Sequence, residues 1–291
     1  MKTKHSYSQL LSMPAATDYD LLDSGAGEKL ERYGKFVVRR PDPQALWPQN
    51  LTERDWQKAD ANFSAQGKWQ LKKALPDRWP VEIDRWKFWI KLSAFKHTGV
   101  FPEQAANWQW IYKQIKDSKK KDISVLNLFA YTGGATLAAA SAGARVCHVD
   151  ASKVALDWAK DNAQLSHLSE KPIRWLLDDA VAFVKRELRR GNKYDAIIMD
   201  PPAFGHGPTG ELWKIERDFV PFVADCAKLL TDKPLFVLVN GYASGYSALA
   251  YHQSVQTVLS DKFATIESGE LLIPEKGGER FLPCGIFARA F

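Results

Sequence analysis

Residues 125–152 read VLNLFAYTGGATLAAASAGARVCHVDAS, and this stretch decides the fold class. The short apolar run at residues 123–129 is typical of a buried strand in a parallel sheet. A turn with two glycines follows, and the small apolar residues 135–142 predict a helix packed closely on that sheet. Residues 145–149 predict a second strand. Alternation of strand and helix at this spacing indicates an α/β sheet.

The same alternation continues toward the C-terminus, where it predicts a doubly wound parallel sheet. We expect further strands at residues 173–177, 194–199 and 234–239, and helices at residues 153–168, 180–190, 212–230 and 248–259. Ser152 can cap the first of these helices, and Gly191 can end the second. The last two apolar segments, residues 264–273 and 280–288, flank a turn and predict an antiparallel edge of the sheet.

The first third of the chain is less regular and differs in composition. Residues 29–40 and 85–92 resemble strands, and several prolines divide the rest into short pieces. We therefore expect a small β-containing domain at residues 1–95 and an α/β domain at residues 96–291. Residues 1–122 contain 22 lysines and arginines against 15 acids, and eight of the 11 tryptophans. This balance favours a polyanionic partner such as RNA, although a small domain with a tryptophan-rich core would have the same composition.

The overall composition excludes several classes of protein. Of 291 residues, 45% are apolar and 25% charged, which is typical of a globular chain. No apolar run has the length of a membrane span, and the first residues lack the continuous apolar region of a signal peptide. The three cysteines are far apart, and the histidines lack metal-ligand spacing. We expect a cytoplasmic protein with reduced thiols, no membrane and no metal; the oligomeric state stays open.

Acidic residues follow three successive strands, where α/β sheets bind their ligands. Asp150 ends the second strand and can accept hydrogen bonds from the two hydroxyls of a ribose. Asp178 and Asp179 follow the third strand; one can accept from an adenine amino group while the other caps the next helix. No G-x-G-x-x-G motif is present, which disfavours a dinucleotide. The pattern predicts a ligand that contains a nucleoside and little phosphate.

The fourth strand ends in Asp200-Pro201-Pro202-Ala203-Phe204. Two consecutive prolines stiffen the backbone and remove two N–H donors, so that carbonyl groups and the Asp200 carboxylate can accept from an amine. The ring of Phe204 offers a face on which a base could stack. We predict that Asp200, Pro201 and Phe204 lie at the reacting group of the substrate.

Together, residues 125–152, the Asp178-Asp179-Ala180 segment and the Asp-Pro-Pro-Ala-Phe-Gly turn resemble class I S-adenosylmethionine-dependent methyltransferases. The similarity is greatest to the group of large-subunit ribosomal RNA methyltransferases and their bacterial relatives. It covers at least residues 96–288, where residues 96–104 (KHTGVFPEQ) resemble a segment that precedes the sheet and folds over the cofactor. The resemblance implies a Rossmann-like, seven-stranded sheet, S-adenosylmethionine as cofactor, and RNA, expected to be ribosomal, as partner.

The resemblance also implies roles for individual residues. Thr98, Phe101 and Glu103 would line the methionine side of the cofactor. Asp150 would take the ribose hydroxyls, and Asp179 the adenine amino group. The remaining residues implied at the cofactor are Asn127, Phe129, Ala130, Tyr131, Thr132, Gly133, Ala151, Ser152, Asp178 and Pro201.

Some members of this group have a cysteine at the end of the fifth strand, where attack on carbon 5 of a pyrimidine needs a thiol. Residues 238–244 (LVNGYAS) contain none, so we expect methylation of a nitrogen in an RNA base. The residue between the prolines and Phe204 leaves amino and ring nitrogens both open. Other hypotheses are methylation of a protein or small molecule, a non-catalytic RNA-binding assembly factor, and a dehydrogenase.

Overall fold

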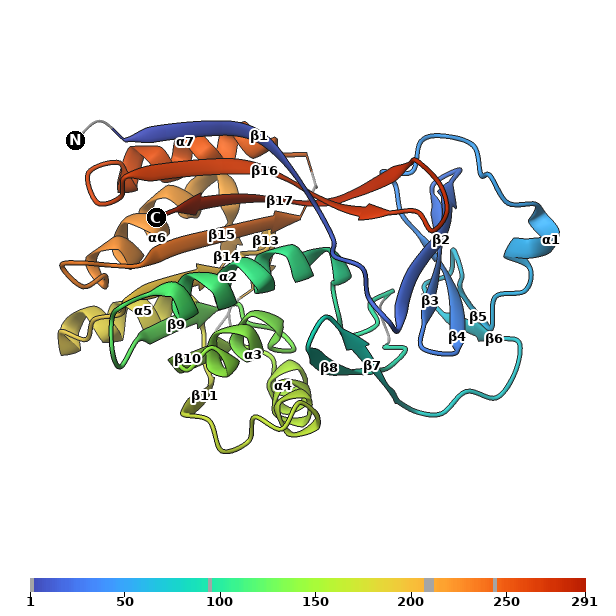
Figure 1. Ribbon diagram of the computed structural model, residues 1–291, viewed down its shortest axis with the longest axis horizontal. Helices are drawn as coiled ribbons and strands as arrows, with labels where there is room; N and C mark the ends of the chain where they lie inside the picture. The colour runs from blue at the N-terminus through green and yellow to red at the C-terminus, as the bar shows by residue number, and fades with distance from the viewer. Residues whose placement is uncertain (1–2, 94–95, 207–211, 243–244) are drawn as a thin grey trace. The chain divides into compact units, whose positions relative to one another are not determined.

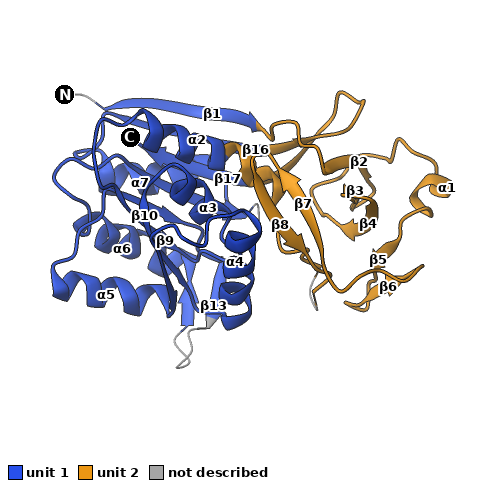
Figure 2. Cartoon of the chain, turned by 60° about the horizontal axis from the view of Figure 1, so that its bottom comes forward, with its two compact units in different colours: residues 1–11, 107–271, 285–291 blue, residues 12–106, 272–284 orange. Residues whose placement is uncertain are grey.

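The computed structural model describes residues 3–93, 96–206, 212–242 and 245–291. The chain forms two compact units, drawn in blue and orange in Figure 2. The first unit consists of Met1–Leu11, Asn107–Leu271 and Gly285–Phe291, and the second of Ser12–Ala106 and Leu272–Cys284. Both units therefore contain segments that are distant in the sequence. The division into domains at residues 1–95 and 96–291 stays a prediction.

An eight-stranded sheet with the order β1-β16-β17-β15-β12-β9-β10-β11 forms the centre of the first unit. Its middle strands are parallel; Met199 of β12, for example, pairs with Leu128 of β9. β17 pairs with β15 in the antiparallel direction, which confirms the α/β fold with an antiparallel C-terminal edge. The strands are β1 (Lys4–Ser12), β9 (Ser124–Leu128), β10 (Arg145–Asp150), β11 (Ile173–Leu177), β12 (Ala196–Met199), β15 (Phe236–Tyr242), β16 (Thr265–Pro274) and β17 (Phe281–Ala290).

The eighth strand, β1, was not among the expected elements, which gave a sheet of seven strands. β1 lies beside β16 at the edge of the sheet, where Lys4 donates its backbone N–H to Ala264 at 2.7 Å. None of its nine residues is fully buried. Because the sequence of β1 lacks the apolar alternation of a half-buried strand, only its pairing with β16 identifies it.

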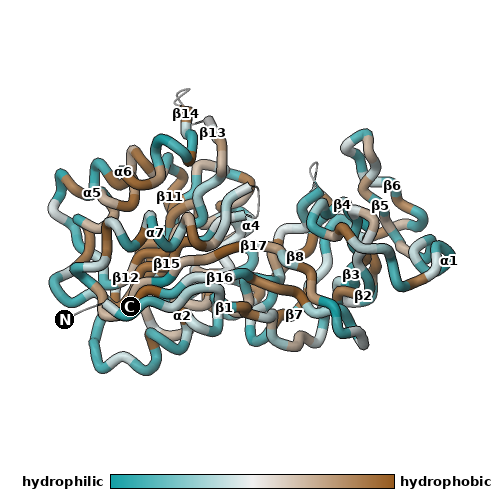
Figure 3. The backbone as a smooth tube through the Cα atoms, turned by 90° about the horizontal axis from the view of Figure 1, so that it is seen from above, coloured by the Kyte–Doolittle hydropathy of each residue, from teal (hydrophilic) through white to brown (hydrophobic). Residues whose placement is uncertain are grey.

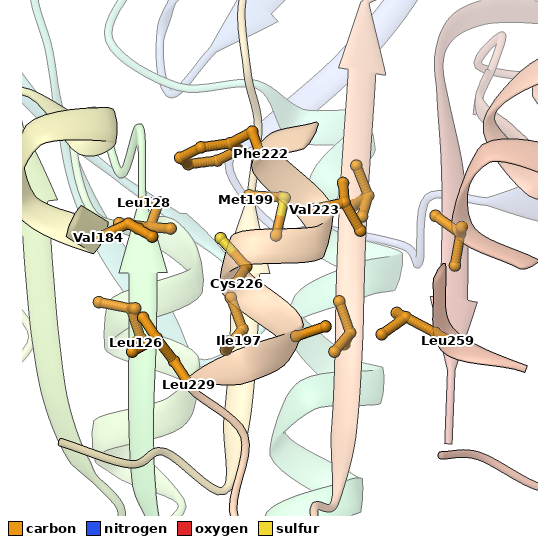
Figure 4. Packing of buried hydrophobic residues seen from close by; sticks show 14 of the residues in the cluster. Leu126, Leu128, Val184, Ile197, Met199, Phe222, Val223, Cys226, Leu229 and Leu259 are labelled. Carbon is orange, nitrogen blue, oxygen red and sulfur yellow. The ribbon is translucent and has the colours of Figure 1, made fainter. Parts of the chain in front are cut away.

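Helices cover both faces of the sheet (Figure 1). Alternate residues of the central strands point to α5, α6 and α7, where Leu126, Met199 and Phe222 belong to one apolar cluster (Figure 4). β15 is buried along most of its length and is coloured as apolar in Figure 3. The helices are α2 (Ala105–Asp117), α3 (Gly134–Ser141), α4 (Lys153–Leu165), α5 (Ala180–Arg190), α6 (Ile215–Lys228) and α7 (Ala248–Leu259).

One predicted helix begins later than expected. Residues 212–214 form the short strand β14 (Leu212–Lys214), which pairs with β13 (Phe204–His206), and α6 begins only at Ile215. The periodicity of residues 212–230 could not reveal this, because the pairing partner of residues 212–214 lies outside that segment. The other caps agree with expectation: Ser152 accepts from the N–H of Ala155, and Gly191 ends α5 in the left-handed conformation.

The second unit is built mainly from strands, as expected for the N-terminal part of the chain. Its strands form one five-stranded and one two-stranded sheet, and the indole N–H of Trp79 donates to the carbonyl of Tyr33 at 3.0 Å. Its elements are β2 (Tyr19–Gly25), β3 (Glu28–Tyr33), β4 (Phe36–Pro41), α1 (Glu53–Trp56), β5 (Ala61–Phe63), β6 (Trp69–Leu71), β7 (Trp79–Ile83), β8 (Trp86–Ile90) and the 3-10 turn η1 (Pro102–Gln104). In the described part of the chain, no helix has the length and apolar character needed to cross a membrane.

Candidate active site

The candidate site lies at the carboxyl ends of the parallel strands. The chain order reverses between β9 and β12, because β10 and β11 follow on one side of β9 while β12 and β15 lie on the other. Open α/β sheets bind ligands in the crevice at such a switch point. Asp150 is the last residue of β10, and Asp200 follows β12 directly. The acids that the sequence singled out are therefore on one edge of one sheet.

A cavity of about 500 Å³ opens at this edge. Acidic side chains line one part of it, and the rings of Phe129, Trp213 and Phe222 line another. Its volume and its largely apolar lining with a few polar groups are typical of a small-molecule site. Five residues predicted at the cofactor contribute to its wall: Phe129, Asp150, Ala151, Asp178 and Asp179.

Asp150 lines the cavity, and its carboxylate links the loop after β9 to the residues that follow β10 through hydrogen bonds. One carboxylate oxygen accepts from the backbone N–H of Tyr131 at 2.7 Å, and the other accepts from that of Ser152 at 2.8 Å. Burial raises the pKa of the Asp150 carboxyl, while these two N–H groups act to lower it. Each oxygen can accept a further hydrogen bond, so the side chain is able to bind hydroxyl groups as well.

Asp178 and Asp179 both line the cavity but have different partners. Asp179 is the N-cap of α5, where its carboxylate accepts from the N–H of Ala182 at 2.8 Å. Asp178 forms an ion pair with Arg186, which lies about two helical turns into α5. The sequence left open which of the two acids caps the helix, and the structure assigns the cap to Asp179.

The loop between β9 and α3 contributes Phe129 to the lining of the cavity. Phe129 and Tyr131 have φ angles of 54° and 50°, and Gly133 has a φ angle of 91°. The N–H of Ala130 donates to the carbonyl of Val149, and the carbonyl of Thr132 accepts from Asn162 at 2.9 Å. Ala130, Tyr131, Thr132 and Gly133 therefore shape the loop next to the cavity and are absent from its lining, as is Ser152.

Asn127 lies elsewhere than expected. Its side chain is buried on the face of the sheet that α3 covers, where it donates to the hydroxyl of Thr136 at 2.9 Å. That hydroxyl also contacts Nδ1 of His148 at 2.9 Å, and burial lowers the pKa of His148 to about 3. Asn127 thus belongs to a buried polar network behind the loop and does not line the cavity. Strand position alone could not distinguish the two faces at this residue.

The Asp-Pro-Pro turn borders the cavity through Pro202, and Pro201 is buried beside it. The carbonyl of Pro202 accepts from the indole N–H of Trp213 at 2.6 Å. Phe204 lies on β13 with 55% of its side chain exposed, and it is absent from the lining of the cavity. The rings that line the cavity are those of Phe129, Trp213 and Phe222. The stacking of a substrate base on Phe204 stays a prediction.

Sequence reasoning missed Trp213 and Phe222. Their rings are 5.5 Å apart, and each lies less than 6 Å from the ring of Phe129. Both fell inside a segment predicted as one amphipathic helix, where apolar residues are expected to pack in the core. One signal in the sequence could have indicated them: their segment closely follows the glycine-rich residues 205–210, which come after the Asp-Pro-Pro turn.

Three residues predicted at the methionine side of the cofactor belong to the second unit. Thr98 and Glu103 are buried there, and the ring of Phe101 packs edge-on against His97 at 5.4 Å. Burial raises the pKa of the Glu103 carboxyl. The role of Thr98, Phe101 and Glu103 at the cofactor stays a prediction.

The three thiols are all buried and lie away from the strand ends. Cys147 is in β10, Cys226 in α6 and Cys284 in β17. Burial raises the pKa of Cys147 to about 11 and raises the pKa values of the other two as well. None is therefore suited to act as a thiolate nucleophile at the candidate site.

Comparison with known proteins identifies the family. Residues 60–245 match the family described as S-adenosylmethionine-dependent methyltransferase. The crystal structure of a SAM-dependent methyltransferase from Agrobacterium tumefaciens is similar over 99% of this chain and 95% of its own, with a TM-score of 0.94 and 39% identity. The crystal structure of SMU.776, a methyltransferase complexed with SAH, has a TM-score of 0.73 at 17% identity and covers 96% of this chain and 76% of its own.

A curated relative is the ribosomal RNA large subunit methyltransferase K/L of Hahella chejuensis, which is 32% identical over 208 residues. The match covers 70% of this chain but only 27% of that protein, so the chain spans about a quarter of its relative. The match to the family over most of the chain confirms the predicted enzyme class and cofactor. The chain belongs to the S-adenosylmethionine-dependent methyltransferases.

Proposed function

We propose that this enzyme transfers a methyl group to a nitrogen of a base in RNA, with ribosomal RNA as the expected substrate. The observation that carries the proposal is the 32% identity to a ribosomal RNA large subunit methyltransferase, together with the Asp-Pro-Pro turn at the cavity. The basic, tryptophan-rich N-terminal region is consistent with a polyanionic substrate. The buried, high-pKa thiols favour a nitrogen acceptor over carbon 5 of a pyrimidine, which needs a thiolate.

The residues at the cavity fit the nucleoside part of the cofactor. Asp150 would accept from the ribose hydroxyls, and Asp179 would accept from the adenine amino group with the capacity that the helix cap leaves. Phe129, Val181 and Phe222 give the cavity apolar surface against which an adenine ring can pack. When bound, S-adenosylmethionine supplies an activated methyl group.

The protein then has to align the acceptor and to receive a proton. Asp200 and the carbonyl of Pro201 can accept hydrogen bonds from an amine, which directs the nitrogen lone pair away from them. The two prolines present no N–H donor that would compete for that lone pair. Transfer would form a nitrogen–carbon bond, break the sulfur–carbon bond that holds the methyl group on the cofactor, and release the proton of the nitrogen, which the Asp200 carboxylate could take. Most of the rate enhancement would come from alignment.

The proposal is tested by methyl transfer from labelled S-adenosylmethionine to RNA from a strain that lacks this gene. The RNA is digested to nucleosides and analysed by mass spectrometry. A labelled N-methyl nucleoside is the expected product, whereas labelled 5-methylcytosine would contradict the nitrogen acceptor. Naked RNA and assembled ribosomal particles are both offered; absence of label in both, with cofactor binding confirmed, would point to a protein or small-molecule substrate.

Asp200→Ala and Asp225→Ala form a matched pair for this assay. Asp225 lines the cavity from α6, whereas Asp200 belongs to the turn that borders the cavity through Pro202. We expect Asp200→Ala to lower turnover at least tenfold and to leave the cofactor Kd within about threefold of wild type, since alignment of the acceptor and its proton route are lost. Asp225→Ala should retain turnover. An equal loss of turnover and cofactor binding in Asp200→Ala would assign Asp200 to the cofactor.

A further inference from the structure

Trp213 is the side chain that connects the wall of the cavity to the Asp-Pro-Pro turn. It lies on β14 with 9% of its surface exposed. Its indole N–H donates to the carbonyl of Pro202 at 2.6 Å. The proposed function assigns no role to Trp213. The indole has a single hydrogen-bond donor, and in this buried side chain that donor is used to bind the turn.

The same ring is part of the aromatic wall. The ring centroid of Trp213 lies 5.8 Å from that of Phe129 and 5.5 Å from that of Phe222, and the last two are 5.7 Å apart. Phe129 comes from the loop after β9, where its φ angle of 54° is uncommon for a residue with a side chain. Phe222 comes from α6. The three rings therefore join the loop after β9, the β13–β14 hairpin and α6.

A second hydrogen bond holds the turn from the same side. The N–H of Ile215 donates to the carbonyl of Ala203 at 3.0 Å, and Gly205 pairs with Trp213 across the hairpin. The carbonyls of two consecutive residues, Pro202 and Ala203, thus receive donors from residues 213–215. Because proline cannot donate a hydrogen bond, the turn depends on donors from elsewhere to fix its orientation.

We propose that Trp213 is a positioning residue, which sets the Asp200–Pro202 turn relative to the cavity so that the acceptor nitrogen and the methyl group are aligned. The inference rests on the proposed function, since it assigns the turn to the acceptor. The indole ring of Trp213 packs against Phe129 and Phe222 in the cavity wall, and its N–H donates to the turn. A displacement of about 1 Å at such a turn can reduce a rate on the order of a hundredfold.

The test separates the contribution of the indole N–H from the contribution of the aromatic wall. Trp213→Phe removes the donor and keeps an aromatic side chain, whereas Phe222→Leu removes an aromatic side chain from the wall and leaves the donor in place. For Trp213→Phe we expect kcat to fall about tenfold or more, with the cofactor Kd within about threefold of wild type. For Phe222→Leu we expect mainly a weaker cofactor Kd, with a smaller fall in kcat at saturating cofactor than in Trp213→Phe.

Amide hydrogen exchange gives a readout that needs no RNA. Exchange at residues 203–205 should be faster in Trp213→Phe than in wild type and unchanged in Phe222→Leu, because the donor to Pro202 is lost only in the first. If Trp213→Phe fails to fold, replacement of the indole by the isosteric benzothiophene removes the N–H and retains the shape. Unchanged kcat and unchanged exchange would overturn the proposal.

The failure of this inference differs from the failure of the proposed function. If wild type methylates RNA and Trp213→Phe does so equally well, Trp213 has no positioning role and the proposed function stands. If wild type transfers no methyl group to RNA, the proposed function fails, while faster exchange at residues 203–205 would still support Trp213 as the group that fixes the turn.

Discussion

At the scale of single residues, Asp150 does more than the sequence indicated. Its position at the end of β10 suggested a ligand for ribose hydroxyls. In the folded chain its carboxylate also accepts hydrogen bonds from the N–H groups of Tyr131, in the loop after β9, and Ser152, after β10. Asp150 therefore orders the loop after β9 before any ligand binds. Loss of its carboxylate should affect both the ligand contact and the order of the loop.

Asp150→Ala should weaken binding of S-adenosylmethionine by about 1–3 kcal/mol, the usual cost of leaving buried polar groups without partners. Isothermal titration calorimetry measures the change. Asp157→Ala is the matched control, because Asp157 is an exposed acid on the neighbouring helix α4, where it forms an ion pair with Lys153. A wild-type Kd for Asp150→Ala would exclude Asp150 from the ribose pocket.

At the scale of elements, the two glycines at the start of α3 are needed for different physical reasons. Gly133 has a φ angle of 91°, which few other residues adopt without strain. Gly134 leaves space for the indole of Trp108 on α2, since a Cβ at this position would lie 2.5 Å from Cε2 of that ring. Gly134 is therefore required by the packing of α2 on α3.

Gly134→Ala should lower the free energy of unfolding by about 1–3 kcal/mol through overpacking. The control is Gly278→Ala, whose Cβ would lie 3.5 Å from the Glu275 carboxylate, an ordinary contact distance, and which should change stability by less than about 0.5 kcal/mol. Urea unfolding followed by circular dichroism compares the two. Trp108→Leu should reduce the cost of Gly134→Ala; an unchanged cost would show that Trp108 is not its cause.

At the scale of the whole molecule, the second unit contains a buried group of charges. Glu31 is fully buried, and its carboxylate accepts two hydrogen bonds from Arg40, at 2.7 and 2.9 Å. Lys29 lies 3.7 Å from Glu31 and 3.2 Å from Asp42. Burial alone raises the pKa of Glu31, but the positive charges of Arg40 and Lys29 outweigh it and lower that pKa to about 2.

Glu31→Gln should lower the free energy of unfolding of this unit at neutral pH by about 3–5 kcal/mol, because it removes the carboxylate that pairs with the buried Arg40. The pKa of Glu31 is lower in the folded state than its ordinary value of 4.5, so the stabilisation is present above pH 4.5 and is lost as the pH falls toward 2. The difference in the free energy of unfolding between wild type and Glu31→Gln should therefore become smaller as the pH falls from 4.5 toward 2.

Urea unfolding followed by tryptophan fluorescence between pH 7 and pH 2 measures this difference. Six of the 11 tryptophans, including Trp56 and Trp79, belong to the second unit, so the signal reports largely on it. Glu279→Gln is the control, because Glu279 is an exposed acid of the same unit. A difference between wild type and Glu31→Gln that stays constant with pH would contradict the assignment of the low pKa to Glu31.

The sequence by itself determined the features that depend on local pattern. Apolar runs of strand length, alternating with amphipathic helices, fix the parallel sheet and its antiparallel C-terminal edge. Because the carboxyl ends of parallel strands meet at one edge, Asp150, Asp179 and Asp200 could be placed at that edge of the sheet from their positions in the sequence. The helix cap at Ser152 was equally local, since a cap and its first turn are adjacent in the chain.

Only the tertiary structure decided which side chains meet across long sequence separations. The strand β1 is identified by its pairing with β16, some 260 residues away, and Trp213 by its contacts with Phe129 and Pro202. The face to which Asn127 points, and the discontinuous make-up of the second unit, have the same origin. Periodicity records whether a residue is buried, but the partner that buries it is set by packing between elements, for which the local sequence carries no signal.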